Sequence, residues 1–418
     1  MQELFVEGGN RLCGELTIQG AKNGVLPVLA ATIVCAGQCR IENCPRLRDV
    51  EASIAILRHL GCCTRWERDA LIVDTTHMDR NEVPDALMRE MRSSVIFLGA
   101  ILARQGEALL SYPGGCELGP RPIDMHLSSL RALGAEIEER GGTLHCRAKL
   151  LTGSELVLPM PSVGATENAL LAACGAEGTT VIYNAAREPE IVELQDFLNA
   201  MGAQVQGAGG SIITVEGGRP LHGGEHRVIG DRIVEATYLC AAAGCGGEVR
   251  LHGVDYRALS TVTAALSEAG CEVRSEEESI TLRSSGRLKA IRPVRTAPHP
   301  GFPTDAQSAL MAALLRSAGS TVFVENIFEN RYRHVDELSR MGADIRVAGR
   351  VAVVSGVRAL HGASVKCTDL RGGAALVLAG LQADGETRLS LLEHIDRGYE
   401  SMERDLTPLG AKLERRGE

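Results

Sequence analysis

The stretch LRALGAEI, residues 130–137, contains the pattern that decides the fold: a helical run, a glycine and then the start of a strand. Glycine directly after a helix is typical of a left-handed C-terminal cap. The pattern occurs six times, as LRHLGC, LRALGAEI, LNAMGAQV, LSEAGCEV, LSRMGADI and LTPLGAKL. The turn glycines, separated by 73, 68, 68, 72 and 68 residues, are Gly61, Gly134, Gly202, Gly270, Gly342 and Gly410. This near-constant interval indicates six internal repeats.

Each repeat also contains an earlier helical segment rich in small apolar residues, such as GATENALLAACG or RIVEATYLCAAAG. Most of these segments are followed by a glycine turn and a short strand such as GTTVIYNA. Helices that are apolar on most faces belong inside a fold. We therefore predict an α/β protein of six βαββαβ-like repeats, three in each of two domains, with helices inside and sheets outside. A plain α/β repeat protein without an active site is the alternative.

Composition restricts the possible partners. The chain has 44 basic and 53 acidic side chains and a net charge of −9, which disfavours binding to nucleic acid or to an anionic membrane. The longest strongly apolar run, residues 25–37, contains Pro27 and is too short to span a bilayer. The segment MQELFVEGG lacks the basic-then-apolar pattern of a signal peptide. We expect a cytoplasmic protein with no nucleic-acid or membrane partner.

The thirteen cysteines do not form a recognisable metal or disulfide pattern. Their number is odd, no CxxC motif occurs, and several lie in apolar helical runs, for example Cys174 and Cys240. We interpret most of them as small buried hydrophobic residues and expect no metal site.

Charged residues gather where the repeats enter their helices. Free backbone N–H groups and the positive end of the helix dipole make such positions suitable for anions. If these helix starts converge on a cleft, at least six cations face one pocket, and the ligand should carry several negative charges. The residues are Lys22, Asn23, Arg92, Arg121, Asp231, Arg232, Asp305, Arg331, Asp369, Arg371 and Arg397.

Seven ordered segments carry a resemblance to a known family. They are GAKNGVLPVLAA (20–31), YPGGCELGPRPIDMH (112–126), AAREPEIVE (185–193), RTAPHPGFPTDAQ (295–307), FENRYRHVDELSRMGA (328–343), TDLRGGAALVLAG (368–380) and HIDRGYE (394–400). They resemble the signature segments of the UDP-N-acetylglucosamine enolpyruvyl transferase family, within the EPSP synthase superfamily. The resemblance runs from residue 1 to about residue 415.

The resemblance implies a two-domain inside-out α/β barrel. One domain would span residues 22–229 and carry the Cys116 loop. The other would comprise residues 1–21 and 230–418 and carry Asp305, Arg331, Arg371 and Arg397.

The implied reaction transfers the enolpyruvyl group of phosphoenolpyruvate to the 3-hydroxyl of UDP-N-acetylglucosamine and releases phosphate through a tetrahedral intermediate. It is the first committed step of peptidoglycan synthesis and needs no cofactor or metal. One alternative is the sister enzyme that acts on shikimate phosphate, which lacks the loop cysteine. Another is a non-catalytic relative that binds nucleotide sugar; the presence of Lys22, Cys116, Asp305 and Arg397 argues against it.

Residue roles follow from the same resemblance. Cys116, in a loop whose glycines and prolines suit a closing lid, would donate a proton, and Asp305 would accept the proton of the sugar hydroxyl. A chance surface cysteine is the alternative for Cys116. From the residues alone Asp305 is more simply a helix N-cap. The phosphoenolpyruvate contacts would be Lys22, Arg121 and Arg397 at the phosphate, Arg331 and Arg371 at the carboxylate and transition state, and Asn23 at the reacting centre.

The UDP-N-acetylglucosamine contacts are also carried over from the family. One departure concerns the segment before SVGAT, where many members have a lysine and this chain has Met160 and Pro161. The predicted contacts are Arg92, Arg121, Pro122, Ile123, Asp124, Met125, Ser162, Val163, Gly164, Asp305 and Ile327. His126 and His299 are interpreted as groups near the cleft rather than as metal ligands.

Overall fold

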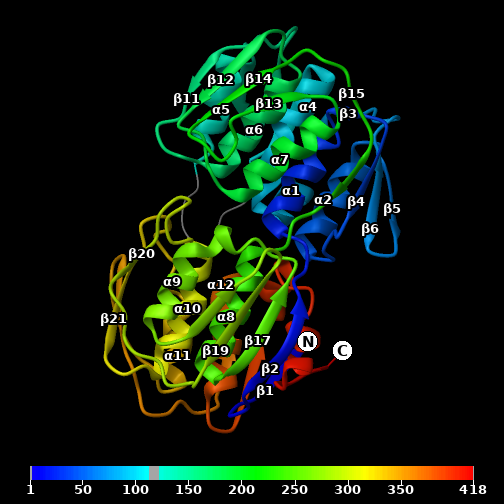
Figure 1. Ribbon diagram of the computed structural model, residues 1–418. Coiled ribbons are helices and arrows are strands. Elements are labelled where there is room, and N and C mark those ends of the chain that lie inside the picture. The colour runs from blue at the N-terminus through cyan, green and yellow to red at the C-terminus, as the bar shows by residue number, and fades with distance from the viewer. Residues whose placement is uncertain (1, 113–121, 418) are drawn as a thin grey trace. The chain divides into compact units, whose positions relative to one another are not determined.

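The computed structural model describes residues 2–112 and 122–417 (Figure 1). Its described residues divide into two compact units. The first unit comprises residues 20–112 and 122–229, and the second comprises residues 2–19 and 230–417. Each unit has its own hydrophobic core.

The described part of each unit contains three four-stranded sheets. In the first unit the strand orders are β16-β4-β6-β5, β7-β8-β10-β9 and β11-β12-β14-β13, and in the second they are β24-β25-β1-β26, β18-β19-β17-β2 and β20-β21-β23-β22. All six sheets share one pattern, in which an edge strand pairs in parallel and the other pairs are antiparallel. The repeat seen in the sequence is therefore a repeat in structure.

The strands have the following bounds. In the first unit they are β3 (Cys35–Ala36), β4 (Gln38–Glu42), β5 (Cys63–Glu67), β6 (Ala70–Asp74), β7 (Glu82–Val83), β8 (Glu107–Ser111), β9 (Glu136–Arg140), β10 (Thr143–Arg147), β11 (Glu155–Val157), β12 (Thr179–Tyr183), β13 (Gln204–Gln206), β14 (Ile212–Glu216), β15 (Leu221–His222) and β16 (Glu225–Arg227). In the second they are β1 (Glu3–Glu7), β2 (Leu12–Thr17), β17 (Gly247–His252), β18 (Glu272–Ser275), β19 (Ser279–Ser284), β20 (Val294–Arg295), β21 (Ser320–Val324), β22 (Asp344–Ala348), β23 (Val351–Ser355), β24 (Ser364–Lys366), β25 (Glu386–Ser390) and β26 (Lys412–Arg416).

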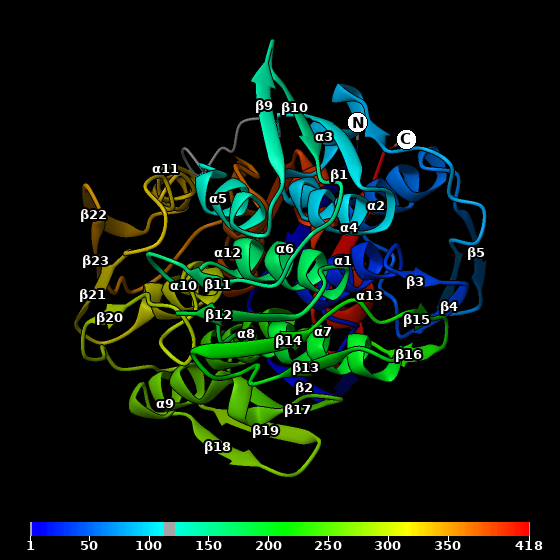
Figure 2. The ribbon, with the colours of Figure 1, turned by 90° about the horizontal axis from the view of Figure 1, so that it is seen from above.

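Six helices form the interior. They are α1 (Lys22–Ala31), α4 (Phe97–Gln105) and α6 (Val163–Cys174) in the first unit, and α8 (Arg232–Cys245), α10 (Thr304–Ala313) and α12 (Leu370–Gln382) in the second. In α12 every residue after Leu370 is buried, as expected for a helix that is apolar on most faces. Small residues let these helices approach closely: a Cβ at Gly244 would lie 2.6 Å from Cδ of Gln382. Sheets lie outside these six inner helices in each unit (Figures 1 and 2), as predicted.

The second helix of each repeat lies outside the inner helices and leads into the predicted glycine turn, in the last repeat through the short helix η5 (Thr407–Leu409). These helices are α2 (Arg48–His59), α5 (Asp124–Ala132), α7 (Pro189–Ala200), α9 (Ser260–Glu268), α11 (Val335–Arg340) and α13 (Met402–Leu406). The six turn glycines have φ between 91° and 104°, a left-handed conformation that side chains with a Cβ rarely adopt. The glycine turns predicted from the sequence are confirmed.

Short helical pieces complete the chain. They are α3 (Asp85–Glu90), η1 (Arg92–Ile96), η2 (Tyr256–Leu259), η3 (Leu314–Arg316), η4 (Leu392–Arg397) and η5 (Thr407–Leu409).

The order of strands within a repeat differs from the prediction. We predicted βαββαβ, whereas the repeat runs strand, inner helix, strand, outer helix, strand, strand, for example β11-α6-β12-α7-β13-β14. The edge strands are only two to six residues long, and several lack the alternating pattern by which strands are recognised. The fold class is unaffected.

The second unit is assembled from both ends of the chain. Strand β1 lies between β25 and β26, with Leu4 opposite Leu389 and Arg415, and β2 pairs in parallel with β17. The first unit is instead closed by β16, which pairs in parallel with β4.

Candidate functional site

Asp305 lies in the first turn of α10, and two buried arginines hold its carboxylate. Oδ1 accepts a hydrogen bond from Nη2 of Arg331 at 2.6 Å. Oδ2 accepts from Nη2 and Nε of Arg371 at 3.1 and 3.3 Å. The Arg331 and Arg371 side chains are 1% and 3% exposed, whereas that of Asp305 is 26% exposed. The carboxylate is therefore the part of this cluster that solvent reaches most easily.

The helix-cap interpretation of Asp305 is wrong. Helix α10 begins at Thr304, and its N-cap residue is Pro303, which has no side chain that can cap it. Asp305 is one position too far into the helix to cap it, so both its oxygens are available to the guanidinium groups.

Arg331 is fixed by the backbone of the same helix. Its Nε and Nη2 donate to the carbonyl oxygen of Thr304 at 3.2 and 2.8 Å. The Thr304 hydroxyl donates to Oε2 of Glu325 at 3.0 Å, and Oε1 of Glu325 accepts from the backbone N–H groups of Ile327 and Phe328. The predicted contact Ile327 is thus connected through Glu325 to the Asp305 cluster, and Glu325 is a residue that the sequence did not single out.

Arg371 is held from the start of α12. The N-cap residue Asp369 accepts hydrogen bonds from the backbone N–H groups of Arg371 and Gly372. Nη1 of Arg371 donates to the Tyr399 hydroxyl at 3.3 Å. Burial lowers the pKa of Arg371, but the Asp305 carboxylate and Tyr399 outweigh it and raise this pKa above its ordinary value, so the guanidinium stays charged.

Such a cluster can exchange one anion for another. Two buried guanidinium groups present forked donors, which suit carboxylate and phosphate equally well. A ligand carboxylate that engaged Arg331 or Arg371 would weaken their hold on Asp305, and a less stabilised carboxylate is a better proton acceptor.

Two of the predicted cations do not lie at helix starts. Arg397 is the last residue of η4 and is half-buried, and Arg331 lies in the turn before α11. In both segments a turn separates the arginine from the next α-helix. The prediction that these two arginines lie at helix starts is therefore wrong. Asp231, by contrast, caps α8 by accepting from the N–H groups of Ile233 and Val234.

In the first unit Lys22 is the first residue of α1, and its Nζ lies 2.8 Å from Oδ2 of Asp49. Asp49 belongs to the first turn of α2, and its side chain is only 2% exposed. A buried carboxylate at this distance restricts where the ammonium group can point. Asn23 follows in α1 and is half-buried, and Arg92 begins η1. The sequence did not single out Asp49.

The other predicted contacts of the first unit lie at the starts of α5 and α6. Ser162 is the N-cap of α6, and its Oγ accepts from the N–H of Ala165 at 3.4 Å, with Val163 and Gly164 next in the helix. Pro122 is exposed, Ile123 is the buried N-cap of α5, and Asp124 and Met125 form its first turn. Met160 is 51% exposed. Cys116 and Arg121 lie outside the described residues.

Comparison with known proteins finds relatives that match almost the whole chain. A family model described as EPSP synthase (3-phosphoshikimate 1-carboxyvinyltransferase) matches residues 6–406. A protein of Caldanaerobacter subterraneus named UDP-N-acetylglucosamine 1-carboxyvinyltransferase 2 is 48% identical over 99% of this chain and 100% of its own length. UDP-N-acetylglucosamine 1-carboxyvinyltransferase 1 of Symbiobacterium thermophilum is 50% identical over 99% of this chain and 95% of its own. The chain belongs to this family of carboxyvinyl (enolpyruvyl) transferases.

Solved structures show that this transferase has the fold of its superfamily. The enolpyruvyl transferase NikO from Streptomyces tendae aligns with a TM-score of 0.90 at 26% identity, covering 99% of this chain and 98% of NikO. EPSP synthase from Acinetobacter baumannii aligns over 100% of both chains with a TM-score of 0.74 at 21% identity, which shows the fold alone.

His126 of this transferase lies in the first turn of α5, and its ring is next to Gly164 at the start of α6. The Asn168 amide is oriented by two other hydrogen bonds, since its oxygen accepts from Gly99 N–H and its nitrogen donates to the Val95 carbonyl. That nitrogen also lies 3.0 Å from Nδ1 of His126, which must therefore accept. Burial, and then the Arg92 guanidinium, lower the pKa of His126 from 6.5 to about 4.

This depressed pKa predicts a loss of stability in acid. The unfolded chain takes up a proton at His126 below pH 6.5, whereas the folded transferase does so only near pH 4, so stability falls as the pH falls between these values. The contribution is at most about 3 kcal/mol. Urea unfolding at pH 7 and pH 5 should show a smaller acid loss for His126→Gln than for the wild type. Equal losses in the two proteins would contradict the prediction.

The described residues contain no disulfide, no candidate metal site and no membrane-spanning helix. Most of the described cysteines are buried, and none of them forms a disulfide. No group of three or more His, Cys, Asp or Glu in the described ranges could hold a metal ion. None of the helices in the described chain of this transferase is long and apolar enough to cross a membrane.

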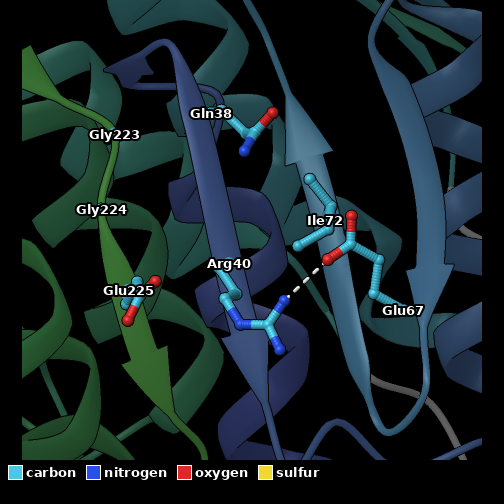
Figure 3. Close-up of a pocket in the computed structure, with 7 residues that line it drawn as sticks. All are labelled: Gln38, Arg40, Glu67, Ile72, Gly223, Gly224 and Glu225. Carbon is cyan, nitrogen blue, oxygen red and sulfur yellow. Dashed lines mark hydrogen bonds and ion pairs between the residues drawn. The ribbon is translucent and has the colours of Figure 1, made fainter.

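A shallow hollow of about 500 Å³ lies over strands β4 and β6 (Figure 3). It is lined by Gln38, Arg40, Glu67, Ile72, Gly223, Gly224 and Glu225. Arg40 is paired with Glu67 at 2.9 Å, and none of the predicted site residues of this transferase lines the hollow.

Proposed function

We propose that this chain transfers the enolpyruvyl group of phosphoenolpyruvate to the 3-hydroxyl of UDP-N-acetylglucosamine. The observation that carries the proposal is the Asp305 carboxylate held by Arg331 and Arg371, within a chain about half identical to transferases named for that acceptor. A carboxylate base beside two buried cations is what an addition to an anionic enol phosphate needs.

In the first step the acceptor oxygen bonds to C2 of phosphoenolpyruvate while a proton is delivered to its C3 methylene. Cys116, proposed from the sequence and outside the described residues, donates that proton, and Asp305 takes the proton of the 3-hydroxyl. The product is a tetrahedral intermediate that retains the phosphate. In the second step the C2–O bond to phosphate breaks, the C3 methyl returns a proton to the Cys116 thiolate, and Asp305 gives its proton to the leaving phosphate, so that the C2=C3 double bond of the enol ether product forms.

In this proposal, different cations bind the carboxylate and the phosphate of phosphoenolpyruvate. Arg331 and Arg371 bind the carboxylate through their forked N–H groups and stabilise charge in the transition state. Lys22, Arg121 and Arg397 bind the phosphate, and Asn23 orients the reacting centre. Catalysis rests on Cys116, Asp305, Lys22 and Arg397 in this proposal, without a cofactor.

The nucleotide sugar would use the helix starts of the first unit. Ser162, Val163 and Gly164 begin α6, where backbone N–H groups face an anion favourably. Arg92, residues 121–125, Asp305 and Ile327 are the further proposed contacts. This chain has Met160 and Pro161 where many members of the family have a lysine, which affects one diphosphate or uracil contact. Two outcomes are open: Arg48 at the start of α2 supplies the contact, or the affinity for the nucleotide sugar is lower.

Phosphate release from phosphoenolpyruvate with separate acceptors tests the proposal. We expect release with UDP-N-acetylglucosamine and none with shikimate 3-phosphate. Release with shikimate 3-phosphate alone would favour the sister activity. No release with either acceptor, combined with binding of UDP-N-acetylglucosamine in calorimetry, would favour a non-catalytic nucleotide-sugar binder. The pathway that follows from the expected result is peptidoglycan synthesis in the cytoplasm, and through it maintenance of cell shape and division.

Cys116→Asp should retain activity, because aspartic acid can also deliver a proton, but should resist thiol-directed epoxides such as fosfomycin. The thiolate is a strong nucleophile that opens an epoxide ring, and the carboxylate is a much weaker one. Residual activity after incubation with the epoxide, measured for wild type and variant, checks this. Equal inactivation of the two forms would remove Cys116 as the target.

A further inference from the structure

Consecutive hydrogen bonds connect Arg371 to the hydroxyl groups of Tyr399 and Thr237. We call this set of hydrogen bonds the row. Nη1 of Arg371 lies 3.3 Å from Oη of Tyr399, which lies 2.8 Å from Oγ1 of Thr237, which in turn lies 2.7 Å from the carbonyl oxygen of Ile233. The Tyr399 and Thr237 side chains are fully or almost fully buried. All these groups belong to the second unit, on α12, the segment before α13, and α8.

The direction of every hydrogen bond in this row is determined by counting protons. A carbonyl oxygen only accepts, so the single hydroxyl proton of Thr237 is used on Ile233. Tyr399 must therefore donate its own proton to Thr237. Its oxygen is then left to accept from the guanidinium of Arg371, which has no acceptor of its own. The row runs in one direction, from Arg371 to the backbone of α8.

This row constrains the rotation of the guanidinium plane. Nε and Nη2 of Arg371 donate to Asp305, while Nη1, on the opposite side of the fork, donates to Tyr399. The Arg371 guanidinium carbon also lies 5.5 Å from the centre of the Tyr399 ring. Under the proposed function the substrate carboxylate competes with Asp305 for Nε and Nη2 of Arg371, whereas Tyr399 contacts Nη1 and can keep its hydrogen bond while substrate is bound.

We propose that Tyr399 and Thr237 are positioning residues that hold the Arg371 fork in the orientation that binds the substrate carboxylate. This inference rests on the proposed function, in which Arg371 contacts phosphoenolpyruvate. Tyr399 supplies a neutral acceptor that does not compete with substrate for the guanidinium charge. Thr237 fixes the direction of the Tyr399 hydroxyl.

The kinetic test compares Tyr399→Phe with Tyr238→Phe. Tyr238 is a matched control because it is equally buried, neighbours Tyr399 with ring centres 6.5 Å apart, and donates one buried hydrogen bond, to Asp405 at 2.9 Å. We expect both variants to lower the melting temperature by similar amounts. Only Tyr399→Phe should lower kcat/KM for phosphoenolpyruvate, by about 10- to 100-fold. Unchanged kcat/KM in Tyr399→Phe, or an equal loss in Tyr238→Phe, would overturn the proposal.

Thr237→Val tests the order of the row. It removes the acceptor of the Tyr399 hydroxyl, and we expect a 3- to 10-fold loss of kcat/KM for phosphoenolpyruvate. The Thr237→Val, Tyr399→Phe double variant should be no worse than Tyr399→Phe, because Thr237 acts only through the tyrosine hydroxyl. Losses that multiply in the double variant would contradict a linear row.

Crystal structures of Tyr399→Phe and Tyr238→Phe provide a readout that needs no activity. We expect the Arg371 guanidinium to rotate away from Asp305 Oδ2 in the first variant and to keep its position in the second. An unmoved guanidinium in Tyr399→Phe would overturn the positioning role. If the wild-type protein releases no phosphate with UDP-N-acetylglucosamine, the proposed function fails, and these structures still decide the role of Tyr399.

Discussion

Asp305→Asn should lower kcat by roughly 10²- to 10⁴-fold, which is the usual contribution of a positioned general base. Asparagine retains an oxygen that can accept from one guanidinium, but it cannot take the proton of the sugar hydroxyl. It also leaves Arg331 and Arg371 without the carboxylate that neutralises them, and both are almost completely buried. A loss of stability should therefore accompany the loss of activity.

Phosphate release and thermal unfolding, measured on the same preparation, separate these two effects. Asp336→Asn is the matched control, since Asp336 is an exposed acid in the first turn of the neighbouring helix α11. It should retain wild-type turnover and melting temperature. Turnover by a folded Asp305→Asn protein within threefold of wild type would exclude Asp305 as the base.

Cys116→Ala should abolish turnover to a similar or greater extent, because alanine has no proton to deliver to the methylene carbon. The matched control is Cys63→Ala, since Cys63 is an exposed cysteine on β5 and remote in sequence from every proposed contact. Circular dichroism should show an intact fold in both variants. A Cys116→Ala protein with normal turnover would remove the thiol from the mechanism and favour another acid.

Sequence periodicity predicted the architecture because it reports features that depend on local geometry. A glycine such as Gly134 or Gly270 is required wherever a helix ends in the left-handed region, so its spacing records the repeat directly. Strand order was predicted less well. A two-residue strand such as Glu82–Val83 is a strand only because β8 lies beside it, and no local pattern encodes that pairing.

In the candidate site, too, local sequence identified individual residues but not the contacts between them. The family segments named Asp305, Arg331 and Arg371, but the sequence gives no sign that the first is held by the other two, 26 and 66 residues away. Asp49, Glu325, Thr237 and Tyr399 are ordinary polar residues in helical or loop segments. Their importance follows from burial beside a charged group, which is a property of the folded chain and not of its local pattern.

The placement of β1 between β25 and β26 has a consequence for synthesis on the ribosome. Residues 20–229 are contiguous and can form their core while the rest of the chain is still being made. Strand β2 has to wait for β17, and β1 stays unpaired for much longer, until β25 and β26 have been made. Because Glu3 then lies opposite Arg416, the two ends could be joined by a short linker and new ends opened elsewhere, giving a circularly permuted protein that no longer has to wait.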